Sequence, residues 1–159
     1  MRIFSELQSR TAEGYDAKGN AIAGKYHVYP EKAAAGLWTT PSDLAKFVIA
    51  MFNIAEGSHD YPINKNLQDE MLFKQIKARA ISNKAYSGLG VFLKGKGNDL
   101  SFSHDGRDKG FIARMVAYPK LKKAFIVMIN HDTALNFMDE ITNEIADTHN
   151  LPGFEKHIC

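Results

Sequence analysis

The sequence predicts an α+β fold, in which an antiparallel β-sheet is flanked by helices. A strong helix start stands at Thr40, and an amphipathic stretch at 134–148 predicts a second helix near the end of the chain. Between them, from Ala85 onward, the pattern changes to short apolar runs separated by glycine, proline and lysine. Strands that are grouped in this way, rather than alternating with helices, are typical of the α+β class.

The helix that begins after Thr40 has the clearest local signals. Thr40 is a good N-cap residue, Pro41 suits the first helical position, and Asp43 stands at capping-box spacing. Apolar residues then recur at helical intervals and predict one buried stripe. A weaker helix is expected at 65–77, whereas residues 1–36 show little periodicity, and their "GYDAKGNAI" segment indicates a turn between extended pieces.

The strands are expected in "YSGLGVFLKG", "LSFSH", "GFIARMVAYP" and "KAFIVMINH". The short connection 118–122 predicts that the last two strands form an antiparallel hairpin. Residues 124–129, "AFIVMI", are apolar without alternation, so both faces of that strand need cover. We expect the C-terminal helix to cover one face and the rest of the chain to leave the other face poorly covered.

Composition limits the possible functions. The 159 residues fit a single domain, 1–159, and the 20 basic and 18 acidic residues give a net charge of +2, with no strong attraction to nucleic acid or to an anionic membrane. Cys159 is the only cysteine, so no intrachain disulfide is possible. The N-terminal "MRIFSELQSRTAEGY" lacks the apolar core of a signal peptide, and no membrane span is expected.

Four segments together resemble the C-terminal part of the serine β-lactamase-like family. This family includes class C β-lactamases, penicillin-binding carboxypeptidases and related esterases. The segments are "AAAGLWTTPSDLAKFV", "YSGLGVFL", "HDGRDKGFIARMVAYP" and "KAFIVMINHD". The resemblance implies a partial β-lactamase/transpeptidase-like fold that lacks its N-terminal portion. It also implies a parent protein that hydrolyses a lactam, peptide or ester through an acyl-serine intermediate, often outside the cytoplasm.

His104-Asp105-Gly106 is similar to the family's third motif, Lys-Thr-Gly or His-x-Gly. The resemblance implies that His104 helps to place a polar substrate group and that Asp105 contacts the substrate. It implies that Gly106 leaves room for the substrate to lie along the strand. The backbone N–H of Arg107 would be the second oxyanion-hole donor, a role worth about 2.7–4 kcal/mol in the transition state.

The nucleophile of the family is not in this sequence. No serine is followed by lysine at the spacing Ser-x-x-Lys, and the second motif, Tyr-x-Asn or Ser-x-Asn, is also missing. Ser103, His104 and Asp105 cannot form a relay, because successive side chains on a strand point to opposite faces. We therefore expect this chain to be inactive alone. No cofactor is implied, and the six histidines lack a metal-type spacing.

Two other hypotheses remain open from the sequence. In the first, the chain is a non-catalytic interaction module that uses the bare edge of the strand at 124–130 to form a homo-oligomer or to dock with a separate N-terminal half. In the second, the chain is a complete α+β domain whose similarity to the family is accidental. A sheet that is closed on both faces by the chain's own elements favours the second of these.

Overall fold

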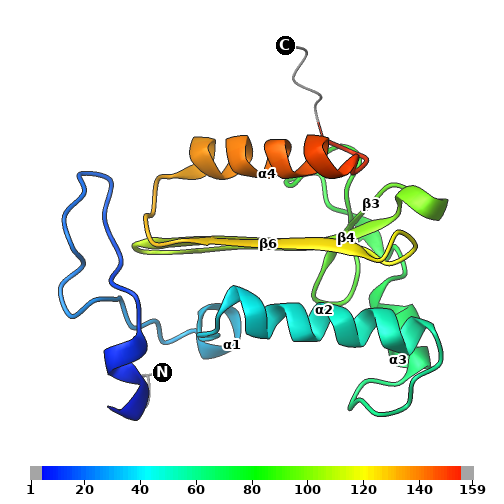
Figure 1. The fold of residues 1–159 in the computed structure, drawn as a ribbon, viewed down its shortest axis with the longest axis horizontal. Helices are drawn as coiled ribbons and strands as arrows, with labels where there is room; N and C mark the ends of the chain where they lie inside the picture. The colour runs from blue at the N-terminus through cyan, green and yellow to red at the C-terminus, as the bar shows by residue number, and fades with distance from the viewer. Residues whose placement is uncertain (1–4, 155–159) are drawn as a thin grey trace.

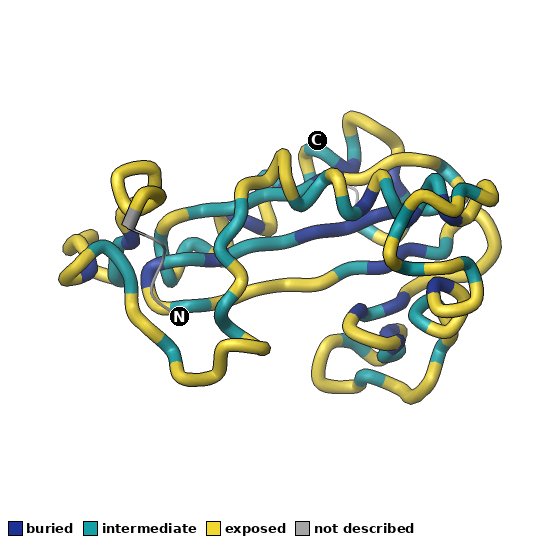
Figure 2. The backbone as a smooth tube through the Cα atoms, turned by 90° about the horizontal axis from the view of Figure 1, so that it is seen from below, coloured by how far each residue is buried: buried dark blue, intermediate teal, exposed yellow. Residues whose placement is uncertain are grey.

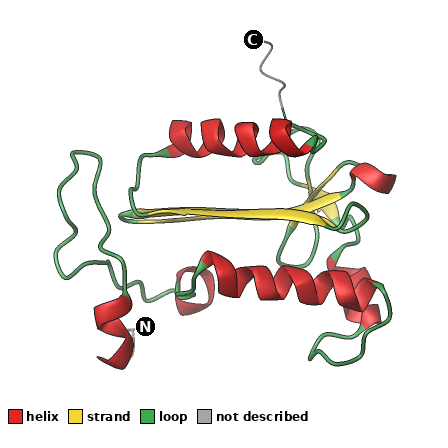
Figure 3. Cartoon of the chain, in the orientation of Figure 1, coloured by secondary structure: helices red, strands yellow, loops and turns green. Residues whose placement is uncertain are grey.

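The computed structural model describes residues 5–154, which form a single antiparallel sheet between helices (Figures 1 and 3). The strands are β1 (Ile76–Lys77), β2 (Tyr86–Ser87), β3 (Phe92–Lys94), β4 (Ser101–Asp108), β5 (Phe111–Tyr118) and β6 (Lys123–Ile129), and they lie in this order across the sheet. The α+β prediction is confirmed. Among the described residues, no helix is both long and apolar enough to cross a bilayer.

The helices lie on both faces of the sheet (Figure 1). The α-helices are α1 (Lys32–Ala35), α2 (Pro41–Ala55), α3 (Lys65–Met71) and α4 (Leu135–His149), and two 3₁₀ helices, η1 (Ser5–Arg10) and η2 (Gly97–Asp99), complete the list. The start of α2 is as predicted, because the backbone N–H of Asp43 donates to Thr40 Oγ1 at 3.1 Å and Thr40 Oγ1 donates to the Asp43 carboxylate at 3.0 Å.

Three elements differ from the prediction. The strand expected in "LSFSH" continues to Asp108 as β4, because β5 pairs with it along this whole length. The helix expected at 65–77 ends at Met71, because the chain then turns into β1 and the N–H of Gln75 donates to Ser87 O at 2.9 Å. The single strand expected in "YSGLGVFLKG" is two strands, β2 and β3. The turn between them contains Gly90 with a φ of 73°, a conformation that glycine adopts without strain.

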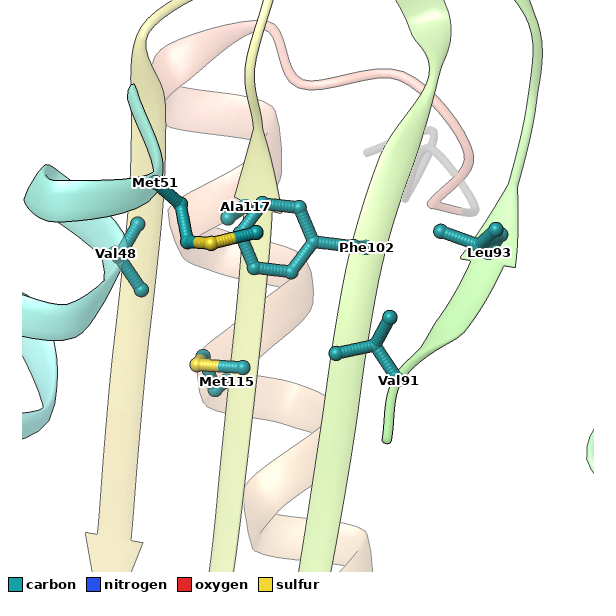
Figure 4. Close-up of a cluster of buried hydrophobic side chains, with 7 residues drawn as sticks. All are labelled: Val48, Met51, Val91, Leu93, Phe102, Met115 and Ala117. Atoms are coloured by element: carbon teal, nitrogen blue, oxygen red, sulfur yellow. The ribbon is translucent and has the colours of Figure 1, made fainter. Parts of the chain in front are cut away.

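The main core lies between α2 and the sheet (Figure 4). Its buried members are Val48 and Met51 from α2 and, from the sheet side, Val91, Leu93, Phe102, Met115 and Ala117. Ile126 of β6 packs against this cluster, while Val127 packs against a second cluster on the other face that includes Ala146 of α4. The face of β6 that α4 leaves free is therefore covered by α2 in part, since Ala124 is exposed and Ile126 and Met128 are half-buried.

The N-terminal segment packs against the end of the sheet where β4 turns into β5. Gly110, in that turn, has a φ of 84°, and a Cβ built on it would stand 2.8 Å from Ile22 Cγ1 and 2.9 Å from Gly14 Cα. Tyr15 lies beside the end of β6, where its N–H donates to Asn130 O at 3.1 Å and its O accepts from Asp132 N at 3.1 Å. Figure 2 shows buried residues along the middle of the strands and exposed residues on most connections.

Candidate active-site wall

The second half of β4 has a strand on only one side. β5 pairs with β4 from Phe102 to Asp108, whereas β3 pairs only with Ser101 to Ser103. Beyond Ser103, no strand of the described residues 5–154 covers the other edge of β4. The third motif, 104–106, and the predicted donor Arg107 occupy this open edge, and all four residues are exposed.

The ladder identifies the backbone groups that face the open edge. The N–H of Gly88 donates to Val91 O at 2.8 Å, which fixes the hydrogen-bonded pairs between β2 and β3. The backbone N–H and C=O of successive residues on an antiparallel strand point alternately to its two neighbours. Those of Val91 point to β2, so those of Phe92 point to β4 and form a hydrogen-bonded pair with Ser103. Two and four residues beyond Ser103, the N–H groups of Asp105 and Arg107 therefore point to the same, unpaired edge.

The side chain of His104 points to the face of the sheet on which α2 packs, and a side chain at Gly106 would point to the same face. Their cross-strand partners are Met115 and Ala113, and Met115 belongs to the core cluster under α2. The ring of His104 stacks on Phe92, with centroids 5.8 Å apart and an interplanar angle of 25°. This contact holds the imidazole next to the first residue of β3, where the open edge of β4 begins.

Gly106 has free space on its substituent side. A Cβ built on Gly106 would meet only the Cβ of Ala113, at 3.7 Å, which is ordinary van der Waals contact. Its φ is not in the positive region, where glycine has its special advantage. Neither packing within the described residues nor backbone conformation therefore explains a glycine at position 106, in contrast to position 110.

Asp105 lies on the opposite face of the sheet and is paired. Its carboxylate accepts from Arg114 Nε and Nη2 at 3.1–3.3 Å, and Arg114 also donates to Asp139 at 2.6 Å and to Thr142 at 3.2 Å. Burial alone would lower the pKa of Arg114, but the bonds to Asp105 and Asp139 outweigh it and raise that pKa. The four residues are therefore divided: His104 and Gly106 share a face, Arg107 presents its N–H at the edge, and Asp105 is tied to α4.

Two groups near the site were not identified from the sequence. Arg114 is a cation within the apolar run "FIARMVAY", a pattern that signals a buried partner. Tyr29 accepts a hydrogen bond from the N–H of Lys109 at 2.8 Å and so helps to hold the turn after β4. At the same turn, burial raises the pKa of Asp108, and the charge of His27 offsets part of this effect.

Beside this turn, Trp38 packs edge-on against Phe111, with ring centroids 5.3 Å apart. Within residues 5–154 there is no group of three metal-ligating side chains. His131 contacts Thr133 through Nδ1 at 3.3 Å. The chain thus presents an open strand edge with a backbone donor, a histidine and an unobstructed glycine.

Comparisons with known proteins bear on the family and the fold of this chain. The family model described as Beta-lactamase matches residues 5–150. A crystal structure of a penicillin binding protein from Bacillus halodurans is similar in fold, with a TM-score of 0.53 at 20% identity. The match covers 65% of this chain and 30% of that chain, so this chain spans less than a third of its length. A search of curated proteins finds no match.

The match of the family model over most of the chain excludes an unrelated domain, although helices of this chain pack on both faces of β6. By fold and by sequence, this chain belongs to the beta-lactamase family.

Proposed function

We propose that this chain forms one wall of the active site of a β-lactamase-like serine hydrolase. In this proposal the attacking serine and its lysine come from residues outside this sequence, because no Ser-x-x-Lys occurs within it. The parent reaction is acyl transfer to water from an ester, amide or lactam. The observation that carries the proposal is the open edge of β4 at the third motif, where Gly106 leaves space and no strand of residues 5–154 lies opposite the N–H of Arg107.

In this site, the N–H of Arg107 donates to the oxygen that becomes negative as the serine attacks the carbonyl. The substrate lies beside Gly106, and His104 contacts a polar group of the substrate. Asp105 has an acidic side chain where the Lys-Thr-Gly form of the motif has a hydroxyl. Position 105 therefore offers no hydroxyl, and its carboxylate lies on the other face of the sheet, paired with Arg114. We therefore propose that the substrate is a neutral ester or amide rather than an anionic lactam whose carboxylate needs that hydroxyl.

The first test is hydrolysis by this chain alone of a chromogenic cephalosporin and of a short-chain nitrophenyl ester. We expect no turnover of either, because the nucleophile is absent. Turnover that disappears when a serine of this chain is replaced would refute the proposal that the nucleophile lies elsewhere.

The second test uses this chain combined with a family N-terminal segment that carries Ser-x-x-Lys. Replacing Arg107 by proline removes the edge N–H but no ladder bond to β5, whereas replacing it by alanine removes only the side chain. We expect the proline variant to lose about 10²–10³-fold in kcat and the alanine variant to lose little. Equal activity of the two variants would exclude Arg107 as the oxyanion donor. If the combined protein does not hydrolyse the ester, this result contradicts the proposal that this chain forms part of the active site.

A second candidate function is docking through the free edge of β6. Tyr15 already pairs with this edge at Asn130 and Asp132. By the same alternation, the N–H groups of Ala124, Ile126 and Met128 point outward without a strand opposite them within residues 5–154. A groove of about 450 Å³, lined mainly by apolar residues of α2 and β6, runs beside this edge. An apolar strand with an open edge favours pairing with a second chain.

We propose that this edge forms a homodimer or receives a separate N-terminal half. Light scattering at increasing concentration tests self-association, with Ala124→Pro to remove one outward N–H and Ala124→Ser as its control. We expect the proline variant to associate less than the serine variant. A monomer at every concentration, with no binding of a dye that reports exposed apolar surface, would contradict self-association.

A further inference from the structure

The net charge of +2 conceals an uneven distribution of charge along the chain. Residues 71–98 contain six of the 20 basic residues and none of the 18 acidic residues. The rest of the chain therefore has an excess of acidic side chains. A local excess of one sign creates a surface potential that the net charge does not reveal.

The fold gathers these six residues on the small strands β1–β3 and their connections, which we call the basic ribbon (residues 73–96). The six residues are Lys74, Lys77, Arg79, Lys84, Lys94 and Lys96. Figure 1 places the basic ribbon at the end of the sheet away from the N-terminal segment. Lys74 Nζ lies 4.8 Å from the centroid of Tyr86 and donates to Gly95 O at 2.6 Å, and the other five are exposed.

Within the described chain, none of these six cations forms an ion pair with a carboxylate. By contrast, Lys46, Lys65 and Lys122, outside the ribbon, each pair with an acidic side chain. The charge of the basic ribbon is therefore not neutralised by the described residues and is available to an anionic partner.

Large apolar side chains stand among these cations. Four of them are strongly exposed: Phe73 at 64%, Ile76 at 69%, Ile81 at 50% and Leu89 at 43%. Phe73 and Ile76 lie at the start of the ribbon, Ile81 lies between β1 and β2, and Leu89 lies in the turn between β2 and β3. Exposed apolar side chains that cluster on one part of a surface indicate an interaction site.

Cations together with exposed aliphatic and aromatic side chains are the combination that binds the surface of an anionic bilayer. The cations attract the lipid headgroups, and the apolar side chains enter the boundary between headgroups and acyl chains. A nucleic acid partner would use the same cations for its phosphates but would gain little from isoleucine and leucine. The apolar members therefore favour a lipid surface.

We propose that the basic ribbon is a peripheral docking surface for an anionic lipid bilayer. The proposal does not depend on catalysis, since the six cations of the basic ribbon lie outside the third motif, which the ribbon contacts through Phe92. Docking through the ribbon leaves the turn between β4 and β5, at the other end of the long strands, directed away from the contact.

Vesicle sedimentation tests the proposal with the whole chain. The vesicles are of phosphatidylcholine, with or without phosphatidylglycerol, at low and at high salt. A charge variant removes three exposed cations of the basic ribbon, and a matched control removes three exposed lysines elsewhere. The charge variant carries Lys77→Gln, Arg79→Gln and Lys84→Gln, and the control carries Lys18→Gln, Lys32→Gln and Lys120→Gln. An apolar variant with Ile76→Ser and Ile81→Ser is paired with Val28→Ser and Leu37→Ser, which are also at exposed positions.

We expect the unmodified chain to bind only the vesicles that contain phosphatidylglycerol and to be released by high salt. The charge variant should bind roughly a hundredfold more weakly, because each basic residue near an anionic surface contributes about 1 kcal/mol. Both controls should bind nearly as well as the unmodified chain, and the apolar variant should bind more weakly than its control.

Three results would overturn the proposal. One is the absence of binding by the unmodified chain, a measurement that needs no variant. Another is an equal loss in the charge variant and its control, which would show a simple effect of net charge. The third is tight binding to duplex DNA together with an unchanged apolar variant, which would assign the basic ribbon to a polyanion instead of a lipid surface.

Discussion

Replacing Gly106 and Gly110 by alanine, one at a time, separates a glycine kept free for a ligand from a glycine required by the fold. A Cβ at Gly106 meets only the Cβ of Ala113, at 3.7 Å. A Cβ at Gly110 meets Ile22 at 2.8 Å and the backbone of Gly14 at 2.9 Å, at a φ of 84°. The two variants have the same chemistry and lie on the same hairpin, so each is the control for the other.

The expected magnitudes follow from these contacts. Gly106→Ala fits an ordinary strand conformation and restricts the unfolded chain, so we expect a change between zero and about 1 kcal/mol in favour of the folded state. Gly110→Ala adds about 1–2 kcal/mol for a left-handed conformation. Overpacking against Gly14 adds about 1–3 kcal/mol. A total near 3 kcal/mol lowers the melting temperature by roughly 6–12 °C in a domain of this size.

Urea unfolding and thermal unfolding, followed by far-ultraviolet circular dichroism, measure both variants. The reasoning predicts that Gly106→Ala unfolds at the same urea concentration as the unmodified chain or a higher one, and that Gly110→Ala unfolds well below it. Destabilisation by Gly106→Ala of more than about 2 kcal/mol would refute it, because such a loss is typical of a methyl group forced into occupied space. The space beside Gly106 would then be occupied by other atoms of this chain.

Three further predictions concern backbone protection, the arginine network and alkaline stability. The amide of Arg107 should exchange with solvent at least tenfold faster than that of Gly106, measured by NMR, because only the latter faces β5. Arg114→Gln should destabilise the fold by about 1–3 kcal/mol in urea, because two carboxylates lose their partner; an unchanged midpoint would show that the network is only a surface feature. Burial raises the pKa of Tyr118 to about 12, so the stability that the neutral phenol contributes is complete below about pH 10 and is lost as the pH rises through 12. Tyr118→Phe should remove this loss of stability at alkaline pH. An unchanged pH dependence in the variant would assign the loss to another group.

The elements with strong local signals were predictable from the sequence. Thr40, Pro41 and Asp43 fix the start of α2 through bonds within one turn, and the bounds of α4 differ by one residue from the predicted 134–148. The hairpin of β5 and β6 was also predictable, because a short polar connection between two apolar runs brings them together directly. The third motif lies on a strand, as the family resemblance implies, but the apolar pattern ended that strand at His104, whereas β4 continues to Asp108.

Other features depended on contacts between residues that are far apart in the chain. β1 replaces the end of a predicted helix because Gln75 finds a partner in Ser87, and this pairing outweighs a weak helical pattern. The cover of β6 by α2 and the bond between Tyr15 and Asn130 are likewise long-range. No periodicity within a short window contains this information.

The sequence by itself determined the type of most elements, the family and the absence of the family's nucleophile, because helix caps, apolar period and motif residues are local properties of the chain. Only the tertiary structure decided which groups are free. It paired Asp105 with Arg114, began β3 opposite Ser103, and left the N–H of Arg107 at an edge that no strand of residues 5–154 covers. Whether a backbone group has a partner depends on the neighbouring strand, and the position of that strand is a property of the whole fold.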